Sequence, residues 1–286
     1  MIHKKIIKEV IDNFINEELS VSEYLIKGVS YASKRIYSKF KENYGNEGEI
    51  DGHLLTRFID FISFGEYGKI DCNVSVIDFK DKEEMLASFE KYDFGGETDQ
   101  INYRINIKLL SLNGELDKQF LYNTLYHEAE HTLQFLKKNG GLYNSLSSYN
   151  KAVKILNGND EVHSSEEYVM IANLLYFYNK LEIEANVNGL YGELINNGCK
   201  LNETNFSVNL NGARNVFKKF IEKYDDSVFS ETMKYFGITY GKLLSFIKRQ
   251  EDYLKYRVRK VYQKAWNDSN KQVEEHKKIS PFGIYI

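Results

Sequence analysis

The sequence is poor in proline, tryptophan and cysteine. Its 286 residues include one proline, one tryptophan and two cysteines. The single proline, Pro281, leaves nearly all of the chain without the residue that most often breaks a helix, which favours a mainly α protein. Cys72 and Cys199 are far apart, which excludes a disulfide framework and a Cys-x-x-Cys metal site. We expect both to be buried as small apolar side chains.

Long apolar runs and a large charge excess are also missing. No segment approaches the roughly 18 apolar residues of a membrane-spanning helix, and residues 1–19 carry charges throughout, unlike a secretory signal. We therefore expect a cytoplasmic protein without a membrane partner. The net charge of −3 gives no bulk attraction to nucleic acid. A basic, aromatic segment at 239–267 hints at nucleic acid, but a solvated helix face explains it more simply, so nucleic acid is not an expected partner.

The most informative stretch that the sequence does contain is His127-Glu128-Ala129-Glu130-His131. It lies within 116–136, where apolar residues recur at spacings of three and four, as in a helix. Asp117 is a candidate N-cap, and Gly140-Gly141 a candidate stop. On a helix, His127 and His131 share one face, so both imidazoles can bind one metal ion. Glu128 then lies beside a water on that metal, where it can serve as a general base.

A site with two histidines needs a third protein ligand, and the segment 181–186 offers two glutamates. Glu182, Ala185 and Asn186 fall on one helix face, whose small residues let another helix approach closely. Asn186 on that face can accept a hydrogen bond from a ligand histidine and so orient its ring. We therefore prefer Glu182 to Glu184, which we expect to be solvated. His163 and the pair Glu166-Glu167 are the next candidates.

Together, His127, Glu128 and His131, followed by Glu182, Ala185 and Asn186, resemble the motifs of gluzincin-type zinc metallopeptidases, the thermolysin-like group. The ending in Asn is similar to the ImmA/IrrE-type peptidases of bacteria and their mobile elements. The resemblance covers about residues 100–195. It implies Zn²⁺ as cofactor and a zincin-like fold, in which an edge strand before the motif helix pairs with extended substrate. The strand predicted at 101–109 precedes the motif helix, as the resemblance requires of the strand that pairs with substrate.

Periodicity elsewhere predicts the remaining elements. Strict alternation predicts strands at 70–76 and 101–109, separated by a helix at 81–92 and a loop at 93–100 that contains Gly95-Gly96. Helical spacing of apolar residues predicts helices at 2–19, 21–44, 53–64, 145–157, 165–196, 211–224, 228–236 and 239–267. A loop or short hairpin is expected at 198–210.

The expected fold class is mainly α (α+β), with a small sheet, then the motif helix, then a helical C-terminal half. We expect three parts: an N-terminal helical segment at 1–65, a zincin-like catalytic core at 66–196 and a C-terminal helical segment at 197–286. The expected function is hydrolysis of peptide bonds in a protein or peptide substrate, with zinc on His127, His131 and Glu182. Two alternatives stay open: a non-catalytic regulatory protein that keeps the fold and binds partners, and a helical module that binds nucleic acid through 239–267.

Overall fold

The computed structural model describes residues 25–92, 94–99, 104–137, 147–160, 163, 165–201, 204–223 and 226–279. The chain divides into two compact units, residues 1–136 and 137–286. The fold class is confirmed, since the chain is mainly helical and carries one small sheet. The division into three parts that the sequence suggested is not tested by this division into two units and stays a prediction.

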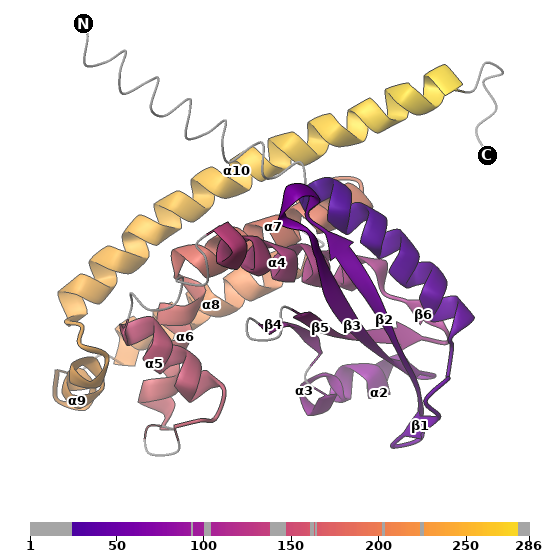
Figure 1. Cartoon of the computed structure of the whole chain (residues 1–286). Coiled ribbons are helices and arrows are strands. Elements are labelled where there is room, and N and C mark those ends of the chain that lie inside the picture. Colours follow the sequence, from indigo (N-terminus) through magenta and orange to yellow (C-terminus); the bar gives the residue numbers. More distant parts are fainter. Residues whose placement is uncertain are drawn as a thin grey trace, which may run out of the picture. The chain divides into compact units, whose positions relative to one another are not determined.

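Unit 1 is built on a mixed sheet (Figure 1). Its strands are β1 (Glu49–Ile50), β2 (His53–Ser63), β3 (Lys69–Phe79), β4 (Gly95–Asp99), β5 (Arg104–Leu112) and β6 (Glu115–Leu116). The order is β1-β2-β3-β5-β4, and β6 pairs with β5. The β3–β5 pair is parallel, and its crossover contains α2 (Lys82–Ala87), α3 (Phe89–Tyr92) and the strand β4. All other pairs are antiparallel, and β4 forms one edge of the sheet.

One face of β2 and β3 is buried along most of its length, and the other is buried mainly near Leu55, Ile77 and Phe79. The helical segment 25–42 buries one stripe of its surface, and its Arg35 donates hydrogen bonds to Asp60 and to the carbonyl of Phe61 on β2. A second cluster of buried side chains is formed by Leu55, Ile77, Phe79, Tyr92, Phe94 and Leu110, with Met85 of α2 and Phe120 packed against it. Arg57 and Ile59, which lie on the same face of β2 as Leu55, are exposed.

Two segments of unit 1 differ from the sequence prediction. Residues 53–64 were expected as a helix, but they form strand β2, which carries apolar residues on both faces, the exposed Ile59 among them, and so shows no alternation. Residues 93–100 were expected as a loop, but Gly95–Asp99 form β4, which pairs antiparallel with β5. The strands predicted at 70–76 and 101–109 are confirmed as β3 and β5, although residues 101–103 lie outside the described part.

The position of β5 corrects one further expectation. The strand at 101–109 was expected to be the edge strand before the motif helix. It pairs with β3 on one side and with β4 on the other, so the edge belongs to β4. The polar side chains of β5 are partly used within unit 1: Asn106 accepts a hydrogen bond from Asn73, and Lys108 donates to the carbonyl of Tyr92.

The motif helix is α4 (Lys118–Lys137), which follows β6. The carboxylate of Asp117 accepts a hydrogen bond from the backbone N–H of Phe120, 2.9 Å away, as an N-cap does. Leu121, Leu125, Ala129 and Leu133 form its buried stripe. The motif therefore lies mid-helix, where the backbone fixes the side-chain directions. The candidate stop at Gly140-Gly141 lies outside the described residues.

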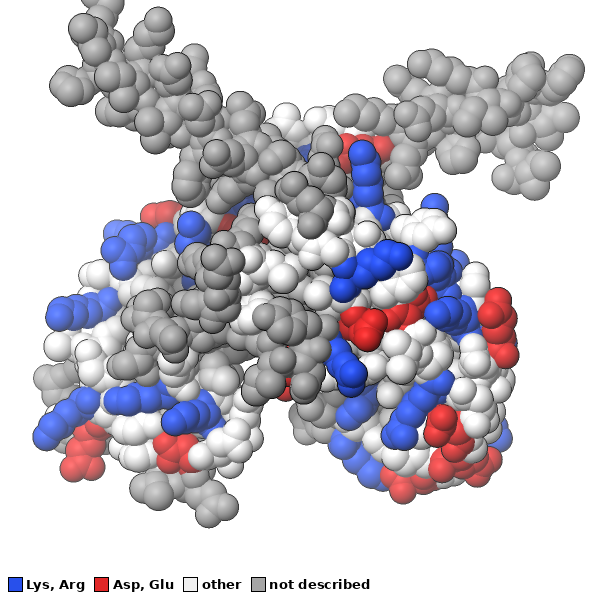
Figure 2. Space-filling view, viewed as in Figure 1, with Lys and Arg blue, Asp and Glu red and all other residues white. Residues whose placement is uncertain are grey.

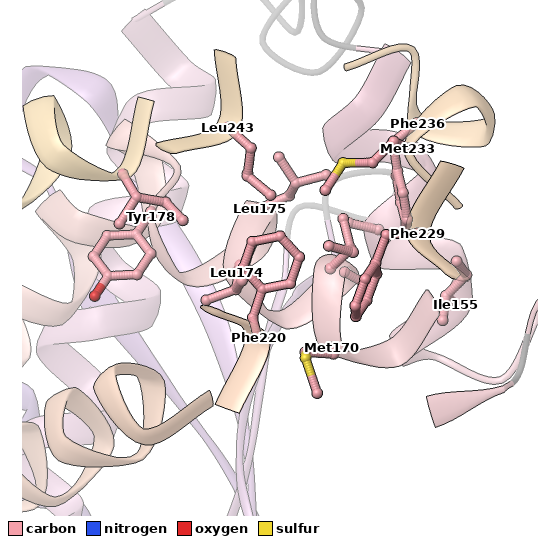
Figure 3. Close-up of a cluster of buried hydrophobic side chains, with 14 residues drawn as sticks. Ile155, Met170, Leu174, Leu175, Tyr178, Phe220, Phe229, Met233, Phe236 and Leu243 are labelled. Atoms are coloured by element: carbon pink, nitrogen blue, oxygen red, sulfur yellow. The ribbon is translucent and has the colours of Figure 1, made fainter. Parts of the chain in front are cut away.

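In its described part, unit 2 is helical, with elements α5 (Ser147–Leu156), α6 (Glu166–Phe177), α7 (Lys180–Asn196), α8 (Asn205–Lys223), α9 (Asp226–Phe236) and α10 (Tyr240–Ile279). Figure 3 shows the core shared by α5, α6, α8, α9 and α10, in which Leu174 and Leu175 of α6 face Phe220, Phe229 and Leu243. The expected single helix at 165–196 is two helices, because the carboxamide of Asn179 caps α7 by accepting from the N–H of Leu181. The loop expected at 198–210 is shorter, since α8 begins at Asn205.

Three further features bear on function. Within the described residues, no helix is long and apolar enough to cross a membrane. Cys72 and Cys199 are buried and free, as expected, and burial raises the pKa of the Cys72 thiol far above its usual range. Acidic and basic side chains are intermingled on the face of unit 1 that Figure 2 shows, so no broad field of one sign covers that face.

Candidate metal centre

The two motif histidines point their ring nitrogens at each other. Nε2 of His127 and Nε2 of His131 are 3.1 Å apart, and the ring planes are inclined at 78°. Two nitrogens held by one tetrahedral zinc at about 2.0–2.1 Å would lie roughly 3.3–3.4 Å apart. The observed separation therefore matches the geometry of a chelating pair. It follows from the i, i+4 spacing on α4, which places both side chains on one face of the helix.

The outer ring nitrogen of His131 also has a partner. Its Nδ1 lies 3.2 Å from Oε1 of Gln134, whose amide nitrogen in turn donates to Oε1 of Glu130. An amide oxygen can only accept, so this contact assigns the proton of His131 to Nδ1. Nε2 is then left with its lone pair, which is the form a metal needs. Gln134 lies three residues after His131 and so holds the imidazole from within the same helix.

Glu128 is buried against the edge strand β4. The residue is only 5% exposed, and its Oε2 accepts a hydrogen bond of 2.8 Å from the hydroxyl of Thr98. A Cβ built on Gly96 would lie 2.4 Å from Cγ of Glu128, so a larger residue there would force β4 or the Glu128 side chain to shift. The edge strand therefore lies in contact with the carboxylate expected to act as the base, and it holds one oxygen of that carboxylate in place.

The structure groups Glu182 with the two histidines. One ligand atom of each of the three residues lies within 4.8 Å of the others, and Glu182 and His131 are buried. Glu182 is in the first turn of α7, and its Oε1 accepts a hydrogen bond of 2.8 Å from the hydroxyl of Tyr149 on α5. Two imidazole nitrogens and one carboxylate oxygen form a donor set that suits Zn²⁺ and leaves a coordination position open, as catalytic zinc sites do.

Glu184 differs from its expected environment. It was expected to be solvated, but its carboxylate accepts hydrogen bonds from Tyr253 and Arg257 of α10, and its side chain is only 13% exposed. Its partners are about 70 residues away in sequence, which is why local spacing gave no sign of them. Glu184 thus fastens α7 to α10, and the preference for Glu182 as the candidate ligand agrees with the geometry.

Asn186 lies on the expected face of α7, four residues after Glu182. Its amide nitrogen donates to the backbone carbonyl of Glu182, 2.8 Å away, which fixes the orientation of the carboxamide. Its expected role, as a hydrogen-bond acceptor for a ligand imidazole, stays a prediction. The acceptor that the structure shows for His131 is Gln134.

Other titratable candidates have structural partners. His163 contacts Asp160 through Nδ1 at 2.8 Å and stacks on Tyr235 with ring centroids 3.9 Å apart. The hydroxyl of Tyr178 donates to Glu251, and burial together with that carboxylate raises the pKa of the phenol above its ordinary value. Tyr126 donates to the carbonyl of Ile26. These contacts give the three side chains partners within their own units.

Four residues near the candidate ligands were not found from the sequence: Gly96, Thr98, Gln134 and Tyr149. Of these, Gln134 could have been found, because it lies at i+3 from His131 on a helix. Gly96, Thr98 and Tyr149 reach the site through strand pairing and helix packing, for which the sequence gave no signal. Comparison of the chain with protein families, with curated proteins and with solved structures finds no match.

Proposed function

We propose that this chain is a zinc-dependent peptidase with His127, His131 and Glu182 as metal ligands and Glu128 as general base. The observation that carries the proposal is the convergence of the two Nε2 atoms and a carboxylate, beside a second, buried carboxylate held by Thr98. A purely structural metal site has no use for that second carboxylate. The resemblance to gluzincin motifs agrees with this assignment.

The residues divide the chemistry between them. When bound, zinc would act as a Lewis acid that lowers the pKa of a water towards about 7 and polarises a carbonyl. Glu128 accepts a proton from the attacking water and passes it to the departing amine. Because the hydroxyl of Thr98 holds Oε2, we assign this transfer to Oε1 of Glu128. Gln134 keeps the proton of His131 on Nδ1 throughout.

The edge strand supports a polypeptide substrate. β4 pairs with β5 on one side, and as an edge strand it offers the backbone groups of its other side to a further strand. An extended peptide that adds to this edge forms backbone hydrogen bonds that do not depend on its sequence. The contact of Gly96 with Glu128 keeps that edge next to the base. Peptide bonds are therefore the substrate class that the geometry favours.

The test combines metal content and turnover of the full chain. We expect close to one zinc per chain by elemental analysis, and cleavage of unfolded casein that carries quenched fluorophores. His127→Ala should lose the zinc. Glu128→Gln should keep the zinc and the fold but lower turnover by about 10²–10⁴-fold. Glu115→Gln, which removes an exposed carboxylate of the same unit, is the matched control and should behave like the wild type.

Two outcomes would decide against the proposal. Zinc retained by both His127→Ala and His131→Ala would show that the motif is not the metal site. Zinc bound at full occupancy by a wild-type chain that cleaves neither casein nor a broad peptide mixture would favour the non-catalytic alternative, a partner-binding protein.

A further inference from the structure

A cavity of about 720 Å³ lies within unit 2, between α5, the α6–α7 junction and the start of α10. Its volume is in the range of pockets that hold small ligands or a few residues of a peptide. Tyr149 of α5 lines it, and the hydroxyl of the same tyrosine donates to Glu182. The cavity is thus one side chain away from the candidate metal ligand of this unit.

The polar groups that line the cavity are hydrogen-bond donors and cations, and no acidic residue is among those described there. Lys242 and Arg249 are seven residues apart on α10, so they lie on one face with Ser245 between them. Neither cation has an ion-pair partner within the described parts of the chain. In a chain with 41 acidic residues, two such cations at one cavity indicate an anionic ligand.

A side-chain amide adds a further polar group to the cavity wall. Asn179 is 5% exposed and lines the same cavity. Its side-chain oxygen caps α7 by accepting from Leu181, which fixes the orientation of the carboxamide. Its amide nitrogen has no acceptor within the described residues. An amide nitrogen in this place can donate to a ligand in the cavity.

The remaining wall is apolar. Leu175, Ile238 and Phe246 line the cavity, and Leu175 belongs to the buried cluster of unit 2 (Figure 3). A free inorganic anion would leave this wall without contact. A ligand that fits both the cations and the apolar wall has an anionic group next to an aliphatic or aromatic group. Peptides have such anionic groups in their side-chain and terminal carboxylates.

We propose that this cavity binds a carboxylate of the polypeptide substrate, and so makes the enzyme prefer substrates with an acidic residue or a free C-terminus at a fixed distance from the cleaved bond. Lys242 and Arg249 neutralise the carboxylate, and Asn179 donates to it. The apolar wall takes the neighbouring side chain. This inference rests on the proposed function only in calling the bound peptide a substrate. Binding of the peptide to the cavity can be measured without cleavage.

The test therefore measures binding to the inactive Glu128→Gln chain by fluorescence anisotropy. The probes are three pools of fluorescein-labelled random octapeptides without Asp or Glu at the random positions. The first pool ends in a free carboxylate, the second in an amide, and the third in an amide with one Glu inserted. We expect the first or the third pool to bind about tenfold or more tightly than the second. Which of the two does so identifies the source of the carboxylate.

The matched variants locate the effect. Lys242→Glu combined with Arg249→Glu should abolish the preference for the acidic pool. Lys248→Glu combined with Lys260→Glu makes the same change in net charge on α10 outside the cavity and should leave the preference intact. Equal binding of all three pools, or an equal loss in both double variants, would overturn the proposal. So would tighter binding of an oligothymidine than of any pool.

These outcomes differ from those of the proposed function. Absence of zinc or of turnover refutes the proposed peptidase function. The binding of the acidic pools can still be compared with that of the amidated pool. A zinc peptidase that cleaves casein but binds the three pools equally refutes the cavity proposal alone.

Discussion

The hydroxyl of Thr98 and the carboxylate of Glu128 are joined by a hydrogen bond of 2.8 Å, which connects the edge strand β4 with the motif helix α4. The same hydroxyl lies 3.1 Å from the backbone carbonyl of Glu128. The two residues are 30 positions apart in sequence. One strand thus forms the outer edge of the sheet and also holds the candidate base.

Thr98→Val should lower kcat by about 10–100-fold, because a hydrogen bond to a charged group is worth about 1.5–3 kcal/mol and tenfold in rate is about 1.4 kcal/mol. Thr98→Ser keeps the donor and should restore most of the rate. KM and zinc content should change little in either variant, since neither the metal ligands nor the outer edge of β4 is altered. A valine variant with wild-type kcat would show that Thr98 does not position the base.

Gln134→Ala should weaken zinc binding by about 10–100-fold, as the loss of a hydrogen-bond partner of a ligand histidine usually does. The reason is its contact with Nδ1 of His131, which fixes the proton and the ring. Competition with a chelator of known affinity measures the effect. Asn186→Ala is the informative comparison. If the asparagine variant loses affinity and the glutamine variant does not, the imidazole is oriented from α7, as the sequence suggested.

Glu182→Ala and Glu184→Ala should have opposite consequences. The first should lose zinc and keep the packing of α7 against α10. The second should keep zinc but lower the free energy of unfolding by about 1–3 kcal/mol, because Arg257 is left inside without its carboxylate. Elemental analysis and urea titration separate the two effects. Loss of zinc in the Glu184 variant alone would show that the helix phase assigned to α7 is wrong.

The sequence was sufficient where one local pattern determines the outcome. The i, i+4 histidines, the cap at Asp117 and the alternation in β3 each depend on near neighbours in the chain, and the structure confirms them. The misassigned segments depend on distant partners. β2 has apolar residues on both faces, including the exposed Ile59, and so shows no alternation. β4 has Gly95-Gly96, a turn signal, but is held by pairing with β5.

The same distinction applies to the site. Spacing on α4 was enough to find the candidate ligands His127 and His131. Thr98 and Tyr149 could not be found, because their contacts with Glu128 and Glu182 span 30 and 33 residues and arise only when the elements pack. The environment of Glu184 was misjudged for the same reason.

Stability of unit 2 should depend on pH through Glu251. Burial alone would raise the pKa of this carboxyl, but hydrogen bonds from Arg214 and Tyr178 outweigh it, and the pKa lies below its ordinary value. A carboxyl with a lowered pKa in the folded state stabilises the fold above its unfolded pKa of about 4.3, and this contribution is lost as the pH falls through the folded value. Glu251→Gln should therefore reduce the urea midpoint at pH 7 and have almost no effect near pH 3. Asp252→Asn, which changes an exposed neighbour on α10, should have little effect at either pH, and equal behaviour of the two variants would contradict the assignment.

Gly96→Ala should abolish the proposed peptidase activity while the rest of the sheet stays folded. The added Cβ would lie 2.4 Å from Cγ and 2.9 Å from Oε1 of Glu128, so either β4 or the carboxylate must shift. Overpacking of this kind costs about 1–3 kcal/mol, and it falls on the carboxylate that we propose as the base. Gly212→Ala on α8 is the matched control, because nothing lies within 4 Å of its added Cβ. That variant should gain about 0.5–1 kcal/mol from the better helix propensity of alanine and keep full activity. Casein cleavage and urea titration of both variants give the result, and a fully active Gly96→Ala would mean that the edge strand does not adjoin the base during turnover.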